Sequence, residues 1–436
     1  MGDVSVYKET GDQFLPDKAF CHSFAVIKIE VDCNGSKTEL FVEETPNSVR
    51  TNRPLLEAIA DENNHPSSCV CLIPIEEERS FLKGKVLKVQ VGEGEWRSHK
   101  INFFNSMIDE KLDRAEGGLA GSGSRFICTL CKATKDSAKS ELGSFCVCRT
   151  YEENAEIAEY IPTNPDNLTK ERLYVIAQGV KSAPLLKSDA IKKGIDATHA
   201  DINLASFFEK VIVRETAQVT VWEKCANIKD ILLQAEAKFD LHVKSTVGIN
   251  PQLMMPGNYA RQLFDEKNQQ HVLHLIPSED RKVALALVLD KLRVLRRVYR
   301  AVQPMREFPE DVANYKKVAV EMGQMLIDNF GYCPWPNYLH KVIEHVQVII
   351  QHEDGPGTVG GLSGEGNEGG KEIFRHFRKN LSRRGDSHGS LRDVLWLHWL
   401  YTSPALQRLA NVVHTQQRCS VCFQVGHNNR TCKTCT

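Results

Sequence analysis

Four side chains near the C-terminus have the types and spacing of a metal site. The pattern C-x2-C-x4-H-x4-C is formed by Cys419, Cys422, His427 and Cys432, and a glycine precedes the histidine. Three thiolates and one imidazole complete a tetrahedral zinc site and leave no position open for a substrate. A segment this short needs the ion in order to fold. We therefore expect a zinc knuckle that grips nucleic acid, with Arg418 and Arg430 beside it.

A second cysteine pair, Cys128 and Cys131, forms half of a zinc site and needs two more ligands from elsewhere. His340 and His345 are candidates, because the H-x4-H spacing is common in such sites. Five positions along a regular helix are about 140° out of alignment, so one histidine of a binding pair should lie at a helix end. The spacing alone leaves open that both are surface histidines. A thioredoxin-type redox pair is disfavoured because no strand–helix–strand pattern surrounds the cysteines.

Two further cysteine pairs, Cys69 with Cys71 and Cys146 with Cys148, alternate at the period of a strand. Each pair would share one strand face, and we expect the thiols to be packed there rather than to bind metal. The chain holds 14 cysteines, and its polar, acidic start has no signal-peptide core. A reducing compartment is therefore expected, and disulfides are not.

Two acidic residues stand at positions suited to a hard cation. Asp109 follows an apolar run and opens a helix-like segment, and Glu368 lies in a glycine-rich stretch before a basic helix. Carboxylates in such places can hold Mg²⁺, which takes few protein oxygens and completes its shell with water and substrate phosphate. The alternative for each is a solvated acid that caps a helix.

Charge is balanced overall but not along the chain. The formal net charge is −1, with 55 Lys and Arg against 56 Asp and Glu. Residues 371–436 hold 3 acidic and 11 basic side chains, and 281–300 is a second basic run with apolar residues at helical spacing. Such faces can meet phosphate, although a solvated helix face is an equal alternative. The candidate DNA contacts here are Arg293, Arg296, Arg297, Arg375, Arg378, Lys379, Arg383 and Arg384.

The elements that must carry these residues change from strands to helices along the chain. Alternating or β-branched patterns predict strands at 24–31, 38–44, 70–75, 85–91 and 100–104, with one helix at 53–62. Helices are predicted at 229–239, 281–300, 311–330, 337–351, 371–380 and 391–402. Residues 354–370 contain eight glycines and predict either a linker or a mobile functional loop. No apolar run is long enough to span a membrane.

Several long stretches resemble one family in collinear order. They are GSGSRFICTLC, GNYARQLFDE, LHLIPSEDR, NYLHKVIEHV, SGEGNEGGKEIFRHFRK and LWLHWLYTS. These stretches are similar to the catalytic core of the V(D)J recombinases and of their transposon relatives of the ProtoRAG and Transib type, and the similarity covers residues 1–412. The terminal zinc knuckle looks more like the transposon branch. The loop before Glu368 lacks the tryptophan of vertebrate members.

The resemblance implies an α/β fold, with a split RNase H-like (DDE recombinase) domain, a large, mostly helical zinc-binding insertion and a helical C-terminal region. Three acids of this family bind two divalent cations, Mg²⁺ or Mn²⁺. The second acid corresponds to Asp109 and the third to Glu368. The family's zinc site joins the two motifs described above, so the implied Zn²⁺ ligands are Cys128, Cys131, His340 and His345.

The implied domain order has five parts. They are an RNase H-like domain at 1–122, a CxxC zinc-binding segment at 123–191, a helical insertion at 192–367, a C-terminal helical domain at 368–412 and the knuckle at 413–436. The first family acid would fall just before Met1, and Asp3 matches a later, non-catalytic aspartate. We therefore expect the chain as given to bind DNA and to be nearly inactive.

The resemblance also implies a function. It is that of a metal-dependent endonuclease that nicks DNA and joins or hairpins the ends by transesterification, at recombination signals or terminal inverted repeats. Its partners would be double-stranded DNA, a second copy of the full-length protein and a second recombination-activating subunit, in the nucleus and not at a membrane. The alternative is a truncated, non-catalytic, zinc-stabilised DNA-binding or assembly protein derived from such a recombinase.

Overall fold

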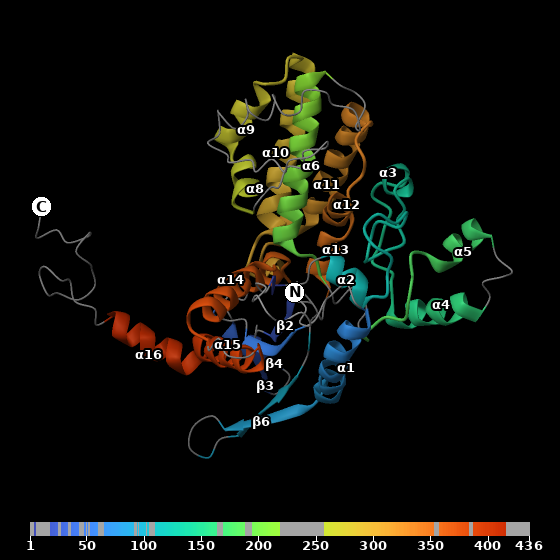
Figure 1. Ribbon diagram of the computed structural model, residues 1–436. Coiled ribbons are helices and arrows are strands. Elements are labelled where there is room, and N and C mark those ends of the chain that lie inside the picture. The colour runs from blue at the N-terminus through green and yellow to red at the C-terminus, as the bar shows by residue number, and fades with distance from the viewer. Residues whose placement is uncertain are drawn as a thin grey trace, which may run out of the picture. The chain divides into compact units, whose positions relative to one another are not determined.

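The computed structural model divides into two compact units (Figure 1). The first unit comprises residues 1–2, 28–45 and 62–364, and the second comprises 3–27, 46–61 and 365–436. The structure describes residues 4–5, 18–24, 28–33, 36–42, 48, 50, 53–59, 65–90, 94, 96–101, 103, 110–163, 169–187, 194–218, 257–352, 357–382 and 387–415. The second unit is thus assembled from segments that are far apart in the sequence.

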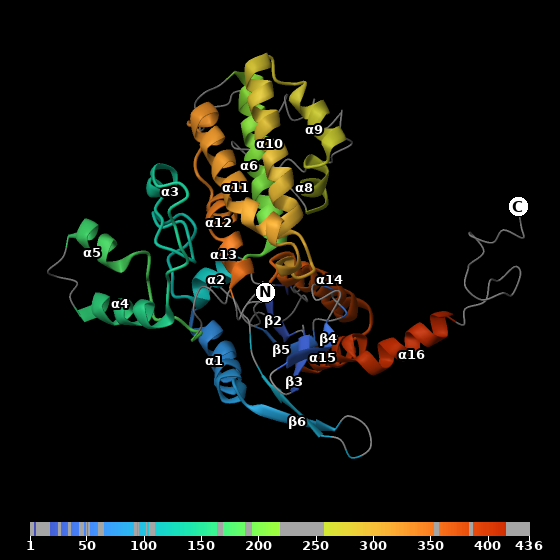
Figure 2. The same ribbon diagram turned by 180° about the vertical axis from the view of Figure 1, so that it is seen from behind.

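Long helices form the centre of the first unit, and both views show them side by side (Figures 1 and 2). They are α6 (Ala197–Ala217), α10 (Glu279–Tyr299), α11 (Pro309–Phe330) and α12 (Asn337–Glu344). Shorter helices continue or cover this bundle, namely α8 (Gly257–Leu263), α9 (Glu266–Leu273), η3 (Met305–Glu307), α13 (Val346–Gln351) and η4 (Gly360–Leu362).

The sequence of α10 explains why this segment is a helix. Ser278 accepts a hydrogen bond from the backbone nitrogen of Arg281 at 3.5 Å, and two acidic residues follow in the first turn. Apolar residues then recur every three or four positions and face the interior. The buried ones are Leu285, Val288, Leu289, Leu292, Leu295, Val298 and Tyr299. The predicted helix at 281–300 is therefore confirmed with its apolar face.

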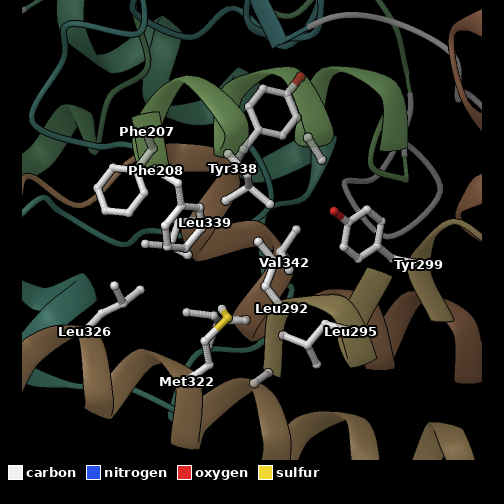
Figure 3. Packing of buried hydrophobic residues seen from close by; sticks show 14 of the residues in the cluster. Phe207, Phe208, Leu292, Leu295, Tyr299, Met322, Leu326, Tyr338, Leu339 and Val342 are labelled. Atoms are coloured by element: carbon white, nitrogen blue, oxygen red, sulfur yellow. The ribbon is translucent and has the colours of Figure 1, made fainter. Parts of the chain in front are cut away.

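The bundle encloses one continuous apolar core (Figure 3). Phe208 of α6, Leu292 of α10, Met322 of α11 and Leu339 of α12 are completely buried and converge on the same interior. Burial of each such side chain stabilises the fold by about 1.5–3 kcal/mol. Cys128 and its partner Cys131 belong to the same cluster, so the cysteine loop is packed against the bundle.

The rest of the first unit consists of shorter elements. Two antiparallel hairpins pair β3 (Lys28–Cys33) with β4 (Ser36–Val42) and β6 (Val86–Gln90) with β7 (Trp96–Lys100). The helices are α1 (His65–Leu82), α2 (Glu110–Glu116), α3 (Ser137–Ser140), α4 (Tyr151–Thr163) and α5 (Lys170–Ala177).

The second unit combines a small sheet with three helices. Antiparallel strands in the order β1 (Val4–Ser5), β2 (Lys18–Phe24) and β5 (Arg53–Ile59) form the sheet. The helices are α14 (Glu365–Asn380), α15 (Ser387–Thr402) and α16 (Pro404–Thr415), and α15 packs against both β5 and α14. Phe374, Phe377 and Val394 form the buried core between α14 and α15.

Two predicted elements are wrong in type. Residues 53–62 were expected to form a helix but contain β5, because pairing with β2 outweighs the helix-favouring composition of this segment. Residues 70–75 were expected to form a strand but lie inside α1. A six-residue apolar run has no period of its own that separates the two structures. Cys69 and Cys71 are therefore helical, not alternating strand residues.

The third cysteine pair also departs from expectation. Cys146 and Cys148 lie in an irregular segment rather than a strand, and both are exposed. The expectation that they are packed is wrong. The flanking Phe145 and Val147 are the ones that pack against the core. Successive residues do alternate between the core and solvent in this segment, but the cysteines are the ones that face solvent.

The other predicted elements agree more closely with the structure. The helices expected at 311–330, 337–351, 371–380 and 391–402 and the strands expected at 24–31, 38–44 and 85–91 overlap observed elements of the same type. β7 ends where the strand at 100–104 was expected to begin. The helix expected at 229–239 lies outside the described residues. No helix in the described ranges has the length and apolar character to cross a membrane.

The described part of the glycine-rich stretch is docked against the bundle. Gly357, Thr358, Val359, Gly360 and Gly361 are buried. A Cβ atom on Gly360 would lie 2.4 Å from the carbonyl oxygen of Arg300, so only glycine allows this approach. The backbone nitrogen of Gly364 donates to Asp196 Oδ1 at 3.0 Å. This part of the stretch is therefore a fixed structural element, and residues 365–370 begin α14.

Candidate metal centre

A tight loop after α2 holds Cys128 and Cys131. The loop is closed by an antiparallel bridge between Phe126 and Thr134 and by a hydrogen bond from Ile127 N to Ala133 O of 3.0 Å. The sulfur atoms accept backbone hydrogen bonds, from Leu130 N to Cys128 Sγ at 3.3 Å and from Ala133 N to Cys131 Sγ at 3.4 Å. N–H groups that point at sulfur stabilise the thiolate form, which is the form that binds metal.

His340 and His345 reach the site because the helix between them ends. His340 lies within α12, while His345 follows the last residue of α12 and has φ −115° and ψ −21°, before α13 begins. In an unbroken helix the two side chains would point in different directions. The change of direction at His345 brings both rings to the same side, as expected from the five-residue spacing.

The structure brings all four side chains together. Cys131 Sγ lies 3.2 Å from His340 Nε2, and Cys128 Sγ lies 3.5 Å from His345 Nε2. The four donor atoms lie within 4.8 Å of one another, and every side chain is at most 1% exposed. Donors bound tetrahedrally to one zinc ion are about 3.3–3.8 Å apart. This arrangement, the Cys₂His₂ cluster hereafter, fits a closed zinc site.

The ring orientations agree with this fit. The Nδ1 atoms of His340 and His345 are buried and have no hydrogen-bond partner in the described part of the chain, whereas both Nε2 atoms are turned toward sulfur. Phe145 packs edge-on against His340 with ring centroids 5.0 Å apart. The aromatic contact holds the His340 ring in place.

In the metal-free protein, the surroundings of the two thiols shift their pKa values in opposite directions. Burial opposes ionisation of Cys128, but the hydrogen bond from Cys131 and the neighbouring histidines outweigh it and hold the pKa of Cys128 well below its ordinary value. The hydrogen bond with Cys128 and then burial raise the pKa of Cys131. The pair therefore shares one proton, which a bound divalent cation would displace.

A buried charged network connects this centre to α2. Glu110 accepts hydrogen bonds from Arg114 Nε at 2.7 Å and from Lys341 Nζ. Arg114 also donates to the carbonyl oxygens of Ala120 at 2.9 Å and Ile127 at 2.5 Å, next to Cys128. Burial disfavours the charge of Lys341, but the carboxylates of Glu110 and Asp113 raise its pKa, so it stays protonated.

Sequence reasoning missed this network. Glu110, Arg114 and Lys341 are charged residues without a motif, and nothing in their spacing marks them as buried. One signal was present in the sequence. Lys341 stands between two histidines on a segment whose other residues are mostly apolar, so a charge there had to be paired if the helix was buried.

The other predicted site residues are placed only in part. Asp109 lies outside the described residues, as do Arg383, Arg384 and the whole knuckle segment 416–436 with Arg418, Cys419, Cys422, His427, Arg430 and Cys432. Glu368 is the fourth residue of α14, but its side chain is not among those described. The structure therefore leaves the proposed pairing of Asp109 with Glu368 as a prediction.

The basic residues of α10 differ in their surroundings. Arg296 binds Asp201 through Nε at 3.0 Å and Nη2 at 2.8 Å, and Arg293 binds Asp290 at 2.6 Å. Both guanidinium groups thus already have carboxylate partners within the first unit. Arg297 is exposed. On α14, Arg375 and Lys379 are exposed and Arg378 is half-buried.

Comparison with known families matches most of the chain in consecutive ranges. Models of four domains of recombination-activation protein 1 (RAG1) match the chain. They are the RNase H domain at residues 1–124, the ZnC2 domain at 126–188, the ZnH2 domain at 193–355 and the C-terminal domain at 365–421. The two cysteines of the Cys₂His₂ cluster fall in the ZnC2 range and the two histidines in the ZnH2 range.

Curated relatives agree with these models. The chain is 34% identical over 414 residues to V(D)J recombination-activating protein 1 of Sus scrofa and 33% identical over 414 residues to that of Xenopus laevis. In both cases the match covers 94% of this chain and 39% of the relative. A 110-residue match to the protein named V(D)J recombination-activating protein 1 of Ginglymostoma cirratum has 37% identity and covers all of that sequence.

The matched domain models define the class of protein, which is an RNase H domain joined to two zinc domains. The chain belongs to the recombination-activation protein 1 family. The resemblance seen in the sequence is thereby confirmed. The chain spans 39% of the length of the Sus scrofa and Xenopus laevis relatives.

Proposed function

We propose that this chain is the catalytic region of a DNA recombinase or transposase. The full-length protein would act as a metal-dependent endonuclease that nicks double-stranded DNA and joins or hairpins the ends by transesterification, at recombination signals or terminal inverted repeats, whereas the chain as given would bind DNA and be nearly inactive. The observation that carries the proposal is the collinear match of four domain models around one closed Cys₂His₂ cluster. The curated relatives are named for V(D)J recombination.

The reacting phosphate would be held through Asp109 and Glu368. Two cations, Mg²⁺ or Mn²⁺, lower the pKa of the attacking water or 3′-hydroxyl and steady the leaving oxygen when they are bound. Asp109 precedes the first residue of α2, and the network of Glu110, Arg114 and Lys341 fixes that helix against the bundle. Glu368 lies in the first turns of α14, which follows the docked glycine segment. Each acid is thus next to, or within, a helix whose position in the chain is established, as a ligand that must be oriented requires.

The zinc ion would have a purely structural role at the Cys₂His₂ cluster. Four protein ligands fill its coordination shell, so no position remains for substrate or for a reactive water. Cys131 and His340 are 209 residues apart in the sequence. Zinc would therefore hold the ZnC2 and ZnH2 ranges together as one body.

This arrangement favours a split RNase H-like domain, in which a zinc-binding insertion separates the two acids. The proposed boundaries are 1–122, 123–191, 192–367, 368–412 and 413–436, and the order of the four matched domain models supports the order of these parts. The knuckle would add a second zinc ion.

Exposed basic residues would position the DNA backbone. Arg297 of α10 and Arg375 and Lys379 of α14 are exposed and suited to phosphate. Arg293 and Arg296, and likewise Arg375 with its exposed partner Glu372, would first have to leave their carboxylate partners. A second copy of the full-length protein, a second recombination-activating subunit and a nuclear location complete the proposal.

The test measures binding of Mn²⁺ by the full chain with electron paramagnetic resonance, in the presence of a DNA duplex. Asp109→Ala and Glu368→Ala should each abolish the tightly bound fraction. Glu372→Ala is the control, because this acid is exposed on the same helix as Glu368. DNA binding should persist in all variants. Equal Mn²⁺ binding in all four proteins would reject the nuclease assignment and favour a non-catalytic, zinc-stabilised DNA-binding protein.

A further inference from the structure

An exposed dithiol lies on the outside of the zinc loop. Cys146 and Cys148 are both exposed, while Val147 between them is half-buried and packs against the core. The two thiols are close enough for the charge of Cys146 to act on Cys148. Neither belongs to the Cys₂His₂ cluster.

The dithiol segment is bonded directly to the loop that carries the buried cysteines. The backbone nitrogen of Cys148 donates to Leu130 O at 3.0 Å, and Leu130 lies between Cys128 and Cys131. Arg149 Nε donates to the carbonyl oxygen of Cys131 at 2.8 Å. The segment with the exposed thiols is therefore hydrogen-bonded to the backbone of the loop that carries the buried ones.

Opposing effects act on the thiol of Cys148. Burial and then the neighbouring Cys146 raise its pKa, and they outweigh the hydrogen bond from the backbone N–H of Lys132 and the charges of Lys132 and Arg149, which lower it. Without metal the thiol therefore keeps its proton, and a bound cation would displace that proton. Lys132 directly follows Cys131. The same loop thus supplies an N–H donor to an exposed sulfur and to both buried ones.

We propose that Cys146 and Cys148 form a capture site for a soft divalent cation, Zn²⁺ in the reduced protein, and that they pass the ion to the Cys₂His₂ cluster. This inference rests on the proposed zinc occupancy of that cluster. The buried donors are at most 1% exposed, so a hydrated ion has no direct access to them. Thiolates are preferred zinc ligands, and two of them on a solvent face leave two positions for water, which makes the bound ion exchangeable.

The transfer balances without a redox partner. In capture, the two sulfurs would displace all but two of the waters of hydrated Zn²⁺ and release their thiol protons. In the transfer, the Zn–S bonds to Cys146 and Cys148 would break and the two remaining waters would leave, while bonds to Cys128, Cys131, His340 and His345 would form. The buried cysteines would lose their remaining thiol proton, and the exposed thiolates would regain protons from solvent.

The experiment titrates the reduced, metal-free full chain with Cd²⁺ and follows the ultraviolet sulfur-to-cadmium charge-transfer band. EDTA is then added, and the rapidly and slowly released fractions are measured. Four proteins are compared, namely wild type, the double variant Cys146→Ser/Cys148→Ser, the double variant Cys128→Ser/Cys131→Ser and the control Ser144→Ala. The control changes an exposed side chain in the same segment and keeps all thiols.

Wild type and Ser144→Ala should show one rapidly released equivalent that the Cys146→Ser/Cys148→Ser variant lacks, and this variant should fill its slowly released fraction several-fold more slowly. Wild-type stoichiometry and loading rate in that variant would overturn the proposal. A collapse of its slow fraction together with its helical circular dichroism would also overturn it, because the dithiol would then be structural. The Cys128→Ser/Cys131→Ser variant should keep the rapid fraction and lose one slow equivalent. If this variant also keeps that slow equivalent, the zinc assignment of the buried cluster fails separately.

Discussion

Lys341 and Glu110 form a buried ion pair although 231 residues separate them in the sequence. Their side chains are 4% and 9% exposed. Lys341 directly follows His340, and Glu110 is the first residue of α2, directly after Asp109. The pair thus joins the helix of the metal centre to the helix that follows a proposed catalytic acid.

Removing one partner of this pair should be costly. Lys341→Met leaves the carboxylate of Glu110 buried with Arg114 as its remaining counter-charge among the described residues. We expect the free energy of unfolding to fall by about 3 kcal/mol, measured by urea denaturation of the zinc-loaded chain. The double variant Glu110→Met/Lys341→Met removes both charges but also takes a carboxylate from Arg114, so it should recover only part of that loss.

Lys291→Met is the matched control for that measurement. Lys291 pairs with Glu321 at 2.6 Å, but both side chains are partly exposed, at 30% and 43%. Its loss should cost less than about 1 kcal/mol. If Lys341→Met were as mild as Lys291→Met, the buried pair would not hold α2 in place.

Stability should fall with rising pH because of Glu209 on α6. Burial raises the pKa of Glu209 to about 8, and Oε2 of its carboxyl group has no hydrogen-bond partner among the described residues. In the unfolded chain the group titrates near 4.5. Between these two pKa values the folded state holds a proton that the unfolded state has lost. The free energy of unfolding therefore falls as the pH rises from 4.5 to about 8.

Glu209→Gln should remove this pH dependence. Because the side chain is only half-buried, we expect the variant to exceed wild type by on the order of 2 kcal/mol above pH 8, and to match it only below about pH 4. Thermal unfolding across that range is the measurement. Glu279→Gln, at an exposed position of α10, should keep the wild-type profile. Parallel profiles for wild type and Glu209→Gln would show that Glu209 is ionised in the fold.

Gly364 should tolerate no side chain. A Cβ atom there would lie 2.4 Å from Asp196 Oδ2, and Asp196 is fixed by hydrogen bonds from Thr198 N at 2.9 Å and His199 Nδ1 at 2.6 Å. We expect Gly364→Ala to lower the free energy of unfolding by about 1–3 kcal/mol. Gly121→Ala is the control, because nothing lies within 4 Å of its added Cβ. Equal stability of the two variants would mean that Asp196 gives way freely.

The sequence predicted best where a pattern extends over many residues. Helices α10 and α11 carry twenty residues of apolar periodicity with capping signals, and both were located closely. The five-residue spacing of His340 and His345 likewise required a helix end, and the structure has one there. Such patterns depend on interactions between residues that are close in the sequence, so they can be interpreted without knowledge of the fold.

Prediction failed where distant parts of the chain decide the outcome. The segment 53–62 has a helix-forming composition, but pairing with β2 makes it a strand. Cys146 and Cys148 alternate as expected, yet which face is covered depends on the bundle to which Val147 packs. The joining of Cys128 to His345 came from resemblance alone, because spacing cannot connect motifs 217 residues apart.

The separation of the zinc ligands also orders events during synthesis. Cys131 leaves the ribosome 209 residues before His340. At 5–20 residues per second the first two ligands wait roughly ten to forty seconds for the last two. During that interval the cysteine loop provides only two of the four ligands, and its thiols can react with other metal ions and with oxidants. All four ligands are present only after the helices of the bundle have been synthesised. Complete metal binding therefore indicates that translation has passed His345.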